Sequence, residues 1–583
     1  MQFKIDDKIV EGREGQTILE VARAQGINIP SLCYHPDLDV KANCRVCLVE
    51  IKGRHKLVTA CSTLIQPAME VYTTSPRVSA ARRLNLELII AEHTKKCGDC
   101  LILPDCQLLQ LAQEYQVKTN RLTERKTLRQ TYRFGSAVEV DGSQCIDCQN
   151  CVEACARQGI NYLKIKGSGS NQEVMPSRDS TAACVYCGQC TLHCPVSAAQ
   201  EQVAWPEVEK ILKDKSKVVI AQFAPSIRVS LGEEFGLPYG ENCEGQIITA
   251  LKKLGFQEVL DVNFGADITT MVEAEELLAR LRDKRAAWPM MTSCCPSWVS
   301  YVEFYHPELI PNLTTARSPH IHLAGALKTY WAKQQGINAK NIVVVSIMPC
   351  TAKKEEARRP ELSLNGQPLV DYVLTTRELA YLIKKAKIDF KNLVPSTNQS
   401  LFNSGSGAAA IYGASGGVME SALRTAVSLV NKESQNKIFD NRLEFTEVRG
   451  LQGFKEAKIQ FPGQRLKVGV INGLSNFSLL LPKLKDYHYI EVMACPGGCI
   501  GGGGQPLPTT KAICEKRIAG LYKIDKSRII RRAHENTAMQ TYYQWVKDNH
   551  LSFQLIYTKF KKSNGSLVKS VVNKKSIFTQ LFK

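Results

Sequence analysis

The chain has 583 residues, of which 22% are charged and 44% hydrophobic, and its formal net charge is +19. That length exceeds what one hydrophobic core supports, so several domains are expected. The sequence contains no run of about 18 apolar residues, which argues against a membrane span, and its first residues resemble neither a signal nor a transit peptide. We therefore expect a cytoplasmic protein.

The cysteines divide the chain into two parts. Most of the 22 cysteines lie before residue 207, in short C-x-x-C spacings. In a long chain without an export signal, such spacings indicate metal or cluster sites and not disulfides. The main domain boundary is therefore predicted near residue 207, with small cofactor modules before it and a larger domain after it.

Residues 1–77 are predicted to form a domain that binds a [2Fe–2S] cluster. The stretch CYHPDLDVKANCRVCLVEI resembles the plant-type ferredoxin domain, a β-grasp fold. Its cysteine spacing departs from the plant C-x4-C-x2-C run, so a zinc site is the alternative. The four candidate ligands are Cys33, Cys44, Cys47 and Cys61.

Residues 78–125 are predicted to hold a [4Fe–4S] cluster with one histidine ligand. His93 precedes Cys97 by one helical turn in EHTKKCGDC, and Cys100 and Cys106 follow. A lone histidine is more often a structural residue, but this one stands in a chain that is rich in cluster motifs. Imidazole in place of thiolate makes a cluster less negative and raises its potential.

Residues 126–207 contain the spacing C-x2-C-x2-C-x3-C twice, which is typical of bacterial ferredoxins with two [4Fe–4S] clusters. In that arrangement the fourth cysteine of each run serves the other cluster. One cluster is predicted on Cys145, Cys148, Cys151 and Cys194, and the other on Cys184, Cys187, Cys190 and Cys155. Zinc sites are the alternative, but zinc ribbons use cysteine pairs and not triplets.

Residues 208–550 are predicted to form an α/β domain. Apolar, β-branched runs alternate with helix-like stretches such as 269–285, and these runs lie at 217–225, 341–350, 466–473 and 489–498. Such alternation predicts parallel sheets covered by helices, with the chemistry at the carboxyl ends of the strands. We expect convergence of the four cysteines that directly follow apolar runs, which are Cys294, Cys295, Cys350 and Cys495.

Three motifs of this domain resemble the signature motifs of [FeFe]-hydrogenases: TSCCP (292–296), MPCTAKKEE (348–356) and MACPGGCIGGGGQP (493–506). The stretch 527–546, within a region of about 515–550, is similar to a segment that is a separate small subunit in some relatives. The resemblance covers residues 1 to about 550. It implies a multidomain α/β protein whose catalytic domain has two mostly parallel sheets around the active site, and it implies the reversible reduction of protons to H2.

The resemblance implies an H-cluster, which is a [4Fe–4S] cubane joined by one thiolate to a two-iron unit with CO, cyanide and a dithiolate bridge. Cys499 would be the bridging thiolate, and the cubane ligands would be Cys295, Cys350, Cys495 and Cys499. The residues implied to contact the two-iron unit are Lys353, Pro225, Ser226, Met348 and Met493. Of these, Lys353 would be the charged hydrogen-bond donor that suits an anionic cyanide. As lone residues, such methionines would only fill a core.

The resemblance also implies a proton relay. Cys294 stands beside a ligand, and the resemblance makes it the residue that passes protons to and from the two-iron unit. Paired acids on a helix more often form a solvated face, but the relay motif of the family also places acids at this spacing. The relay residues would be Glu273, Glu276 and Arg280, with Thr314 in place of the family's serine. His320 stands where relatives tend to carry an amide residue.

Partners follow from the same resemblance. It implies an acidic ferredoxin as electron partner, which a net charge of +19 would attract, and maturation proteins that supply the two-iron unit. The protein would be a monomeric ferredoxin hydrogenase that binds no nucleic acid. The alternatives are a non-catalytic electron-transfer subunit of the complex I type and an H2-sensing relative. Residues 551–583 hold seven lysines and no acid, which predicts a basic, flexible tail.

Overall fold

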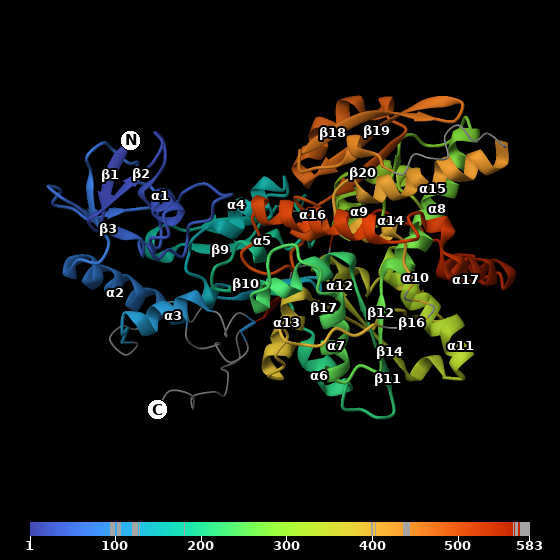
Figure 1. Ribbon diagram of the computed structural model, residues 1–583, viewed down its shortest axis with the longest axis horizontal. Helices are drawn as coiled ribbons and strands as arrows, with labels where there is room; N and C mark the ends of the chain where they lie inside the picture. Colours follow the sequence, from blue (N-terminus) through green and yellow to red (C-terminus); the bar gives the residue numbers. More distant parts are fainter. Residues whose placement is uncertain are drawn as a thin grey trace.

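The computed structural model describes residues 1–583 except 92, 94–99, 102–105, 119–125, 127–128, 180, 398–399, 401, 403, 435–443, 564, 566–568 and 572–583. The predicted ligand Cys97 lies outside the described residues. The small N-terminal modules occupy one end of an elongated molecule, and the large α/β domain occupies the other (Figure 1).

The N-terminal domain is a five-stranded sheet with the strand order β2-β1-β5-β3-β4, in which only β1 and β5 are parallel. Its strands are β1 Gln2–Ile5, β2 Lys8–Glu11, β3 Leu48–Ile51, β4 Val58–Thr59 and β5 Glu70–Tyr72. Helix α1 (Ile18–Ala24) starts at a capping box, because Thr17 and Glu20 each accept a hydrogen bond from the other's backbone amide. The apolar side of α1 then packs on Phe3 and Ile5 in one core.

Two helices, α2 (Pro76–Ile90) and α3 (Gln107–Glu114), connect this domain to the two-cluster module. That module contains a β8-β9 hairpin and most of the sheet β10-β7-β6-β21. Its elements are β6 Thr131–Phe134, β7 Val138–Asp141, α4 Asn150–Arg157, β8 Leu163–Lys166, β9 Glu173–Pro176, α5 Gln189–Leu192 and β10 Ala199–Glu201. Its core continues into the larger domain through Trp298 and Ile471, so the boundary near residue 207 does not separate two independent cores.

The prediction of a flexible tail from residue 551 is wrong for the first part of that segment. Leu555 and Ile556 are buried, and the Thr558 amide donates to the Thr315 carbonyl. Further on, β21 (Lys569–Val571) pairs antiparallel with β6. The basic composition hid a few apolar side chains whose burial holds the segment in place. Residues 572–583 lie outside the described part of the chain.

The large domain contains two four-stranded sheets. The first, β12-β11-β14-β17, is entirely parallel, and the second, β13-β20-β19-β18, is parallel except for β18. The strands of the first sheet are β11 Val218–Phe223, β12 Glu258–Asp261, β14 Ile342–Met348 and β17 Tyr372–Thr375. Those of the second are β13 Met290–Met291, β18 Phe454–Phe461, β19 Gln464–Asn472 and β20 Tyr489–Met493.

Helices cover both sheets and carry much of the site. The 20-residue helix α8 (Asn263–Arg282) packs against α10 and α15, and its first three turns are buried. The other helices of at least four residues in the described part of the domain are α6 Trp205–Ile211, α7 Glu244–Leu254, α9 Pro296–Tyr305, α10 Pro319–Ala326, α11 Ala332–Gln335, α12 Ala352–Glu356, α13 Thr376–Lys385, α14 Gly407–Ala410, α15 Gly417–Ser434, α16 Lys511–Ser527, α17 Thr537–Asp548 and α18 Ser552–Leu555, besides short 3-10 and π turns.

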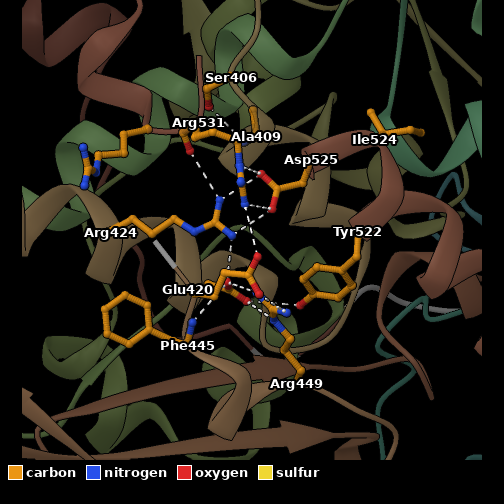
Figure 2. Close-up of polar contacts among 12 residues, drawn as sticks. Ser406, Ala409, Glu420, Arg424, Phe445, Arg449, Tyr522, Ile524, Asp525 and Arg531 are labelled. Carbon is orange, nitrogen blue, oxygen red and sulfur yellow. Dashed lines mark hydrogen bonds and ion pairs between the residues drawn. The ribbon is translucent and has the colours of Figure 1, made fainter. Parts of the chain in front are cut away.

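A buried ion network joins α15 to α16 (Figure 2). Arg424 of α15 donates to both oxygens of Asp525 of α16 at 2.9 Å, and to Glu420 at 2.7 Å. Arg449 also binds Glu420, and Arg531 binds Asp525. Because three guanidinium groups face two carboxylates, every buried charge in this network has an opposite partner. The segment that resembles a small subunit is thereby held against the rest of the domain.

Among the described residues, none of the helices combines the length and the apolar character that crossing a bilayer requires.

Candidate active site

Five cysteines of the large domain meet where strands of the two sheets end. Cys294 and Cys295 follow β13, Cys350 follows β14, and Cys495 and Cys499 follow β20. All five line one cavity of about 80 Å³. This agrees with the expectation that the cysteines after the apolar runs converge, and Cys499, which the resemblance named as a further ligand, joins them from a separate turn after β20.

Four of these thiols lie close enough to act on one another. Burial raises the pKa of the Cys350 thiol to about 12, and the neighbouring Cys295 adds to this effect. Burial likewise raises the pKa of Cys499, to which Cys350 and Cys295 contribute. A group of buried thiols without a cation is costly as thiolates, but iron binds thiolates and removes that cost. The four are thus suited to hold a cubane cluster.

The walls of the cavity fit a bulky cofactor with anionic ligands. The Ser226 hydroxyl is fully buried and, within the described part of the chain, has no hydrogen-bond partner, although it lines the cavity. A buried hydroxyl without a partner is unfavourable, so it favours a ligand that accepts from it. Pro225, Met348 and Met493 supply the apolar wall. On Gly502, which also lines the cavity, a Cβ would lie 2.3 Å from the Pro349 oxygen, so only glycine fits there.

Lys353 also lines this cavity and is held by two acceptors. Its Nζ donates to Glu356 Oε2 at 2.6 Å and to the Cys294 carbonyl at 3.1 Å. Burial opposes the charge of Lys353, but Glu356 outweighs burial, so the pKa of Lys353 is raised. An ammonium has three N–H groups, and the third remains for a ligand in the cavity.

His320, whose role the sequence left open, belongs to the same network. Its Nε2 lies 2.7 Å from Glu356 Oε2, and its Nδ1 lies 3.2 Å from Ser346 Oγ. Gln222 donates to Ser346 Oγ at 2.6 Å, so the Ser346 proton is free to point at Nδ1. Nε2 then carries the ring proton and donates to Glu356. Burial and Lys353 lower the pKa of His320, which keeps the ring neutral.

The inner part of the predicted relay is assembled in the structure. Glu273 is fully buried on α8, and Thr314 Oγ1 donates to its Oε1 at 3.2 Å. Burial raises the pKa of Glu273 from its ordinary value of 4.5 to about 8, although hydrogen bonds from Tyr489 and Thr314 oppose this shift. Cys294 is buried close by, and the charge of Glu273 contributes to raising its pKa. A buried acid that titrates near neutral pH can carry protons.

A residue that sequence reasoning missed contacts the outer part of the predicted relay. Glu276 accepts from the amide and the hydroxyl of Thr315 at 2.9 and 3.0 Å, and Arg280 donates to its other oxygen at 2.6 Å. Adjacent threonines, Thr314 and Thr315, therefore contact the two acids separately. The two acids stand three residues apart on α8, and two successive hydroxyls match that spacing. The repeated threonine in NLTTARSPH was the signal that pointed to this pair.

The accessory cysteines gather as the ferredoxin spacing predicts. Burial raises the pKa of Cys190, and Cys187, Cys184 and the distant Cys155 raise it further. Burial raises the pKa of Cys148 in the same way, with contributions from Cys194 and Cys145. The fourth cysteine of each run therefore lies with the other run. Cys495 of the cavity lies 3.9 Å from the Cys187 carbonyl oxygen, so one accessory site adjoins the cavity.

The first cysteine group is also compact. A hydrogen bond from the Cys44 thiol lowers the pKa of Cys33 to about 6, and a hydrogen bond from Cys61 lowers the pKa of Cys47. The charge of Cys33 opposes this shift by raising the pKa of Cys47, so the Cys33–Cys44 pair lies close to the Cys47–Cys61 pair. Cys33 also acts on Cys148 of the two-cluster module, which places the two sites side by side.

His93 is oriented as a ligand should be. It is buried, and its Nδ1 lies 2.9 Å from the Gln144 carbonyl oxygen. A carbonyl oxygen only accepts, so Nδ1 carries the proton and the Nε2 lone pair is free for a metal. Cys106 is buried and Cys100 is half-buried, while Cys97 lies outside the described residues.

Four family models match this chain. The iron only hydrogenase large subunit, C-terminal domain, matches residues 217–503, and the iron hydrogenase small subunit matches residues 511–563. A 2Fe-2S iron-sulfur cluster binding domain matches residues 1–76, and a 4Fe-4S dicluster domain matches residues 144–198. The small-subunit match extends through the packed first part of the segment that the sequence predicted to be a tail.

The chain is similar along nearly its whole length to characterised hydrogenases. It is 38% identical to the NADP-reducing hydrogenase subunit HndD of Solidesulfovibrio fructosivorans, with 96% of this chain and 99% of that protein aligned. It is 39% identical to iron hydrogenase 1 of Clostridium pasteurianum, with 94% and 98% aligned. The structure of a variant of the apo [FeFe]-hydrogenase HydA1 of Chlamydomonas reinhardtii matches with a TM-score of 0.55 at 35% identity, covering 62% of this chain and 100% of that one. The chain therefore belongs to the [FeFe]-hydrogenase family, whose members bind iron–sulfur clusters and an H-cluster.

Proposed function

We propose that this protein is a hydrogenase that catalyses 2H⁺ + 2e⁻ ⇌ H2 with electrons from an acidic ferredoxin. The observation that carries the proposal is the cavity itself. Four thiols face it, a fifth thiol stands free beside them, and a buried acid with a pKa of about 8 lies behind that free thiol. This arrangement combines a cluster site with a group that can deliver protons.

The proposed cofactors are one [2Fe–2S] cluster, three accessory [4Fe–4S] clusters and one H-cluster. The ligands of the accessory clusters are those predicted from the spacings, including His93 and Cys97. Cys295, Cys350, Cys495 and Cys499 would hold the cubane, with Cys499 as the bridging thiolate. When bound, the H-cluster supplies the iron-centred redox chemistry that interconverts protons and H2.

The residues around the cavity hold and orient this cofactor. Lys353 and Ser226 each offer a donor to a cyanide, and Pro225, Met348 and Met493 exclude water. Exclusion of water strengthens each of these polar contacts. In this proposal the contact between Cys495 and the Cys187 carbonyl marks where electrons enter from the accessory clusters.

Protons move through this chain's own side chains. Cys294 would exchange a proton with the cofactor at its Sγ, and Glu273 would exchange one with Cys294. Thr314 passes the proton at its Oγ1, and Thr315, Glu276 and Arg280 hold the outer end. Glu276 and Arg280 are largely buried, with side-chain exposures of 16% and 11%, so the relay ends just below the surface.

Ferredoxin as the partner is supported by charge. A protein with a net charge of +19 attracts an acidic protein, and this attraction weakens as salt screens it. Maturation proteins that supply the two-iron unit, and a cytoplasmic location that keeps many thiols reduced, belong to the same proposal.

A second candidate is a hydrogenase that works with pyridine-nucleotide-linked subunits. Its support is the relative of 38% identity, which is described as a subunit of an NADP-reducing hydrogenase. The two candidates share the same active site and differ only in the electron donor. Matured protein should evolve H2 with reduced ferredoxin, and the KM for ferredoxin should rise with ionic strength. H2 evolution with reduced methyl viologen but none with ferredoxin would favour the second candidate.

The alternatives without catalysis are tested by the free cysteine. Matured Cys294→Ala should keep the CO and cyanide infrared bands and lose most of the H2 evolution seen with reduced methyl viologen. The electron-transfer-subunit alternative predicts no such bands in the parent, and the H2-sensing alternative predicts bands with little H2. If Cys294→Ala kept the parent's activity, the proton relay proposed here would be wrong.

A further inference from the structure

A tyrosine that belongs to none of the sequence motifs contacts the central acid of the relay. Tyr489 begins β20, the strand that leads to Cys495, and its side chain is fully buried. Its hydroxyl donates to Glu273 Oε2 at 2.7 Å. The other oxygen of Glu273, Oε1, faces Thr314 Oγ1 at 3.2 Å. The two oxygens of one carboxyl group therefore have different partners.

Among the described residues, the groups that act most strongly on Glu273 include no cation to stabilise its ionised form. The groups with the strongest electrostatic contacts to it are Glu276 of α8, Thr314, Tyr489 and Glu491 of β20, Cys294, and Tyr412. All are hydroxyls, acids or a thiol. Burial therefore dominates and raises the pKa of Glu273 to about 8, so the carboxyl group exchanges a proton near neutral pH.

Tyr489 restricts where that proton can reside. Burial and the nearby Glu273 raise the pKa of Tyr489 well above its ordinary value, so the phenol keeps its own proton. A phenol that always donates to Oε2 disfavours a second proton on that oxygen. The exchangeable proton of Glu273 must then sit on Oε1, which is the oxygen on the Thr314 side.

Thr314 can respond to both states of the acid. Ser293 Oγ lies 2.8 Å from Thr314 Oγ1 and donates its own proton to the Ala316 carbonyl at 3.0 Å. When Glu273 is ionised, Thr314 donates to Oε1. When Oε1 is protonated, Thr314 accepts from it and turns its own proton to Ser293 Oγ. The Thr314 hydroxyl therefore rotates once each time Glu273 gains or loses its proton.

We propose that Tyr489 is a positioning residue of the relay, which by binding Glu273 Oε2 makes Oε1 the oxygen that takes up and releases the proton. The inference rests on the proposed role of Glu273 as a proton carrier. In the transfer step the O–H bond at Oε1 forms as the S–H bond of Cys294 breaks, and it breaks again when the proton returns to the Cys294 sulfur, while Thr314 keeps its own proton and turns it between Oε1 and Ser293 Oγ. No electron moves in this step.

The test compares two tyrosines that are two residues apart. Tyr489→Phe removes one hydroxyl from Glu273 and keeps the ring in the core. Tyr487→Phe is the matched control, because Tyr487 is equally buried but its hydroxyl binds Glu456, away from the relay. Both variants and the parent are matured, and H2 evolution is measured from pH 6 to 10, a range of about two units on either side of the Glu273 pKa.

We expect Tyr489→Phe to lower kcat about tenfold, because a carboxyl group that can turn no longer keeps its proton on the Thr314 side. The alkaline limb of its pH profile should also move to higher pH, because the lost hydrogen bond had lowered the pKa of Glu273. Tyr487→Phe should match the parent in both respects. Tyr489→Phe with the kcat and pH profile of Tyr487→Phe would overturn the inference while the proposed function stands.

A spectroscopic measurement keeps the test independent of turnover. The C=O stretch of protonated Glu273, assigned by its loss in Glu273→Gln, should move to higher frequency in Tyr489→Phe and stay in place in Tyr487→Phe, because one donor to the carbonyl oxygen is gone. An unmoved band in Tyr489→Phe would overturn the inference. Full H2 evolution by Glu273→Gln would overturn both the inference and the proposed relay.

Discussion

Two buried glutamates of the large domain, Glu273 and Glu420, have opposite electrostatic surroundings. Glu420 binds Arg424 and Arg449, and these arginines outweigh the effect of burial and lower the pKa of Glu420. Among the described residues, the groups that act most strongly on Glu273 are hydroxyls, acids and a thiol, and burial raises its pKa to about 8. Both side chains are fully buried, so burial alone does not decide how a carboxyl group behaves.

The difference distinguishes a carboxylate that stays ionised and stabilises the fold from a carboxyl group that can gain and lose a proton. A carboxylate with arginine partners stays ionised and ties separate segments together, as Glu420 of α15 does with Arg449 (Figure 2). A carboxyl group without a cation changes its protonation state near neutral pH and can carry protons. The absence of arginine around Glu273, among the residues that face it, is thus as informative as its burial.

The largest effect is expected when Glu273 is replaced by a residue that cannot ionise. Glu273→Gln should lower H2 evolution by about 10²- to 10⁴-fold, which is the usual range for loss of a general acid or base. The iron content, the infrared bands and the unfolding temperature should stay close to those of the parent, because an amide suits a site without cations. H2 evolution above one tenth of the parent's rate would contradict the assignment of Glu273 as a proton carrier.

The corresponding change at Glu420 should lower the stability of the fold. Glu420→Gln leaves Arg424 and Arg449 buried without a full counter-charge, and breaking such a pair costs about 3–5 kcal/mol of stability. Thermal unfolding followed by circular dichroism measures this cost. The control is Glu209→Gln, which breaks an exposed pair with Lys385 and should leave the unfolding temperature almost unchanged. If Glu420→Gln and Glu209→Gln had the same unfolding temperature, Glu420 would not be the structural carboxylate inferred here.

The two acids should respond to pH in opposite directions. The pKa of Glu273 is raised, so its contribution to stability is complete below about 4.5 and is lost as the pH rises through about 8. The pKa of Glu420 is lowered, so its contribution is present above 4.5 and is lost as the pH falls through the lower folded value. The difference in unfolding temperature between the parent and Glu273→Gln should change from about pH 6 to about pH 9, and that between the parent and Glu420→Gln should change from about pH 6 to about pH 3. The same dependence for both variants would refute this reading.

The smallest effect is expected at His320, which lines the cavity and is joined to Lys353 through Glu356. His320→Leu removes a donor to Glu356, which holds Lys353, so the cyanide infrared bands of matured protein should shift and turnover should fall only a few-fold, by about 1 kcal/mol for one hydrogen bond. His320→Gln retains a donor and should leave the bands in place. Identical bands in all three proteins would mean that His320 does not act through Lys353.

Much of this organisation could be predicted from local patterns. The apolar runs at 217–225 and 341–350 became β11 and β14, and the ferredoxin spacing placed Cys155 with the opposite run. Such features depend on neighbours in sequence. The tail was predicted wrongly because its lysines dominate the composition, whereas its position depends on a few buried side chains such as Leu555.

By itself the sequence determined the cysteine groups, the α/β pattern and the presence of acids on one face of α8, because each is a short-range regularity. Only the tertiary structure decided what those acids meet. Tyr489 lies 216 positions from Glu273, and Arg424 reaches Asp525 across 101 positions. The pKa of a buried carboxyl group is set by such distant partners and by the loss of water around it. The acid proposed to carry protons and the structural acid therefore look alike in sequence and differ only in the folded chain.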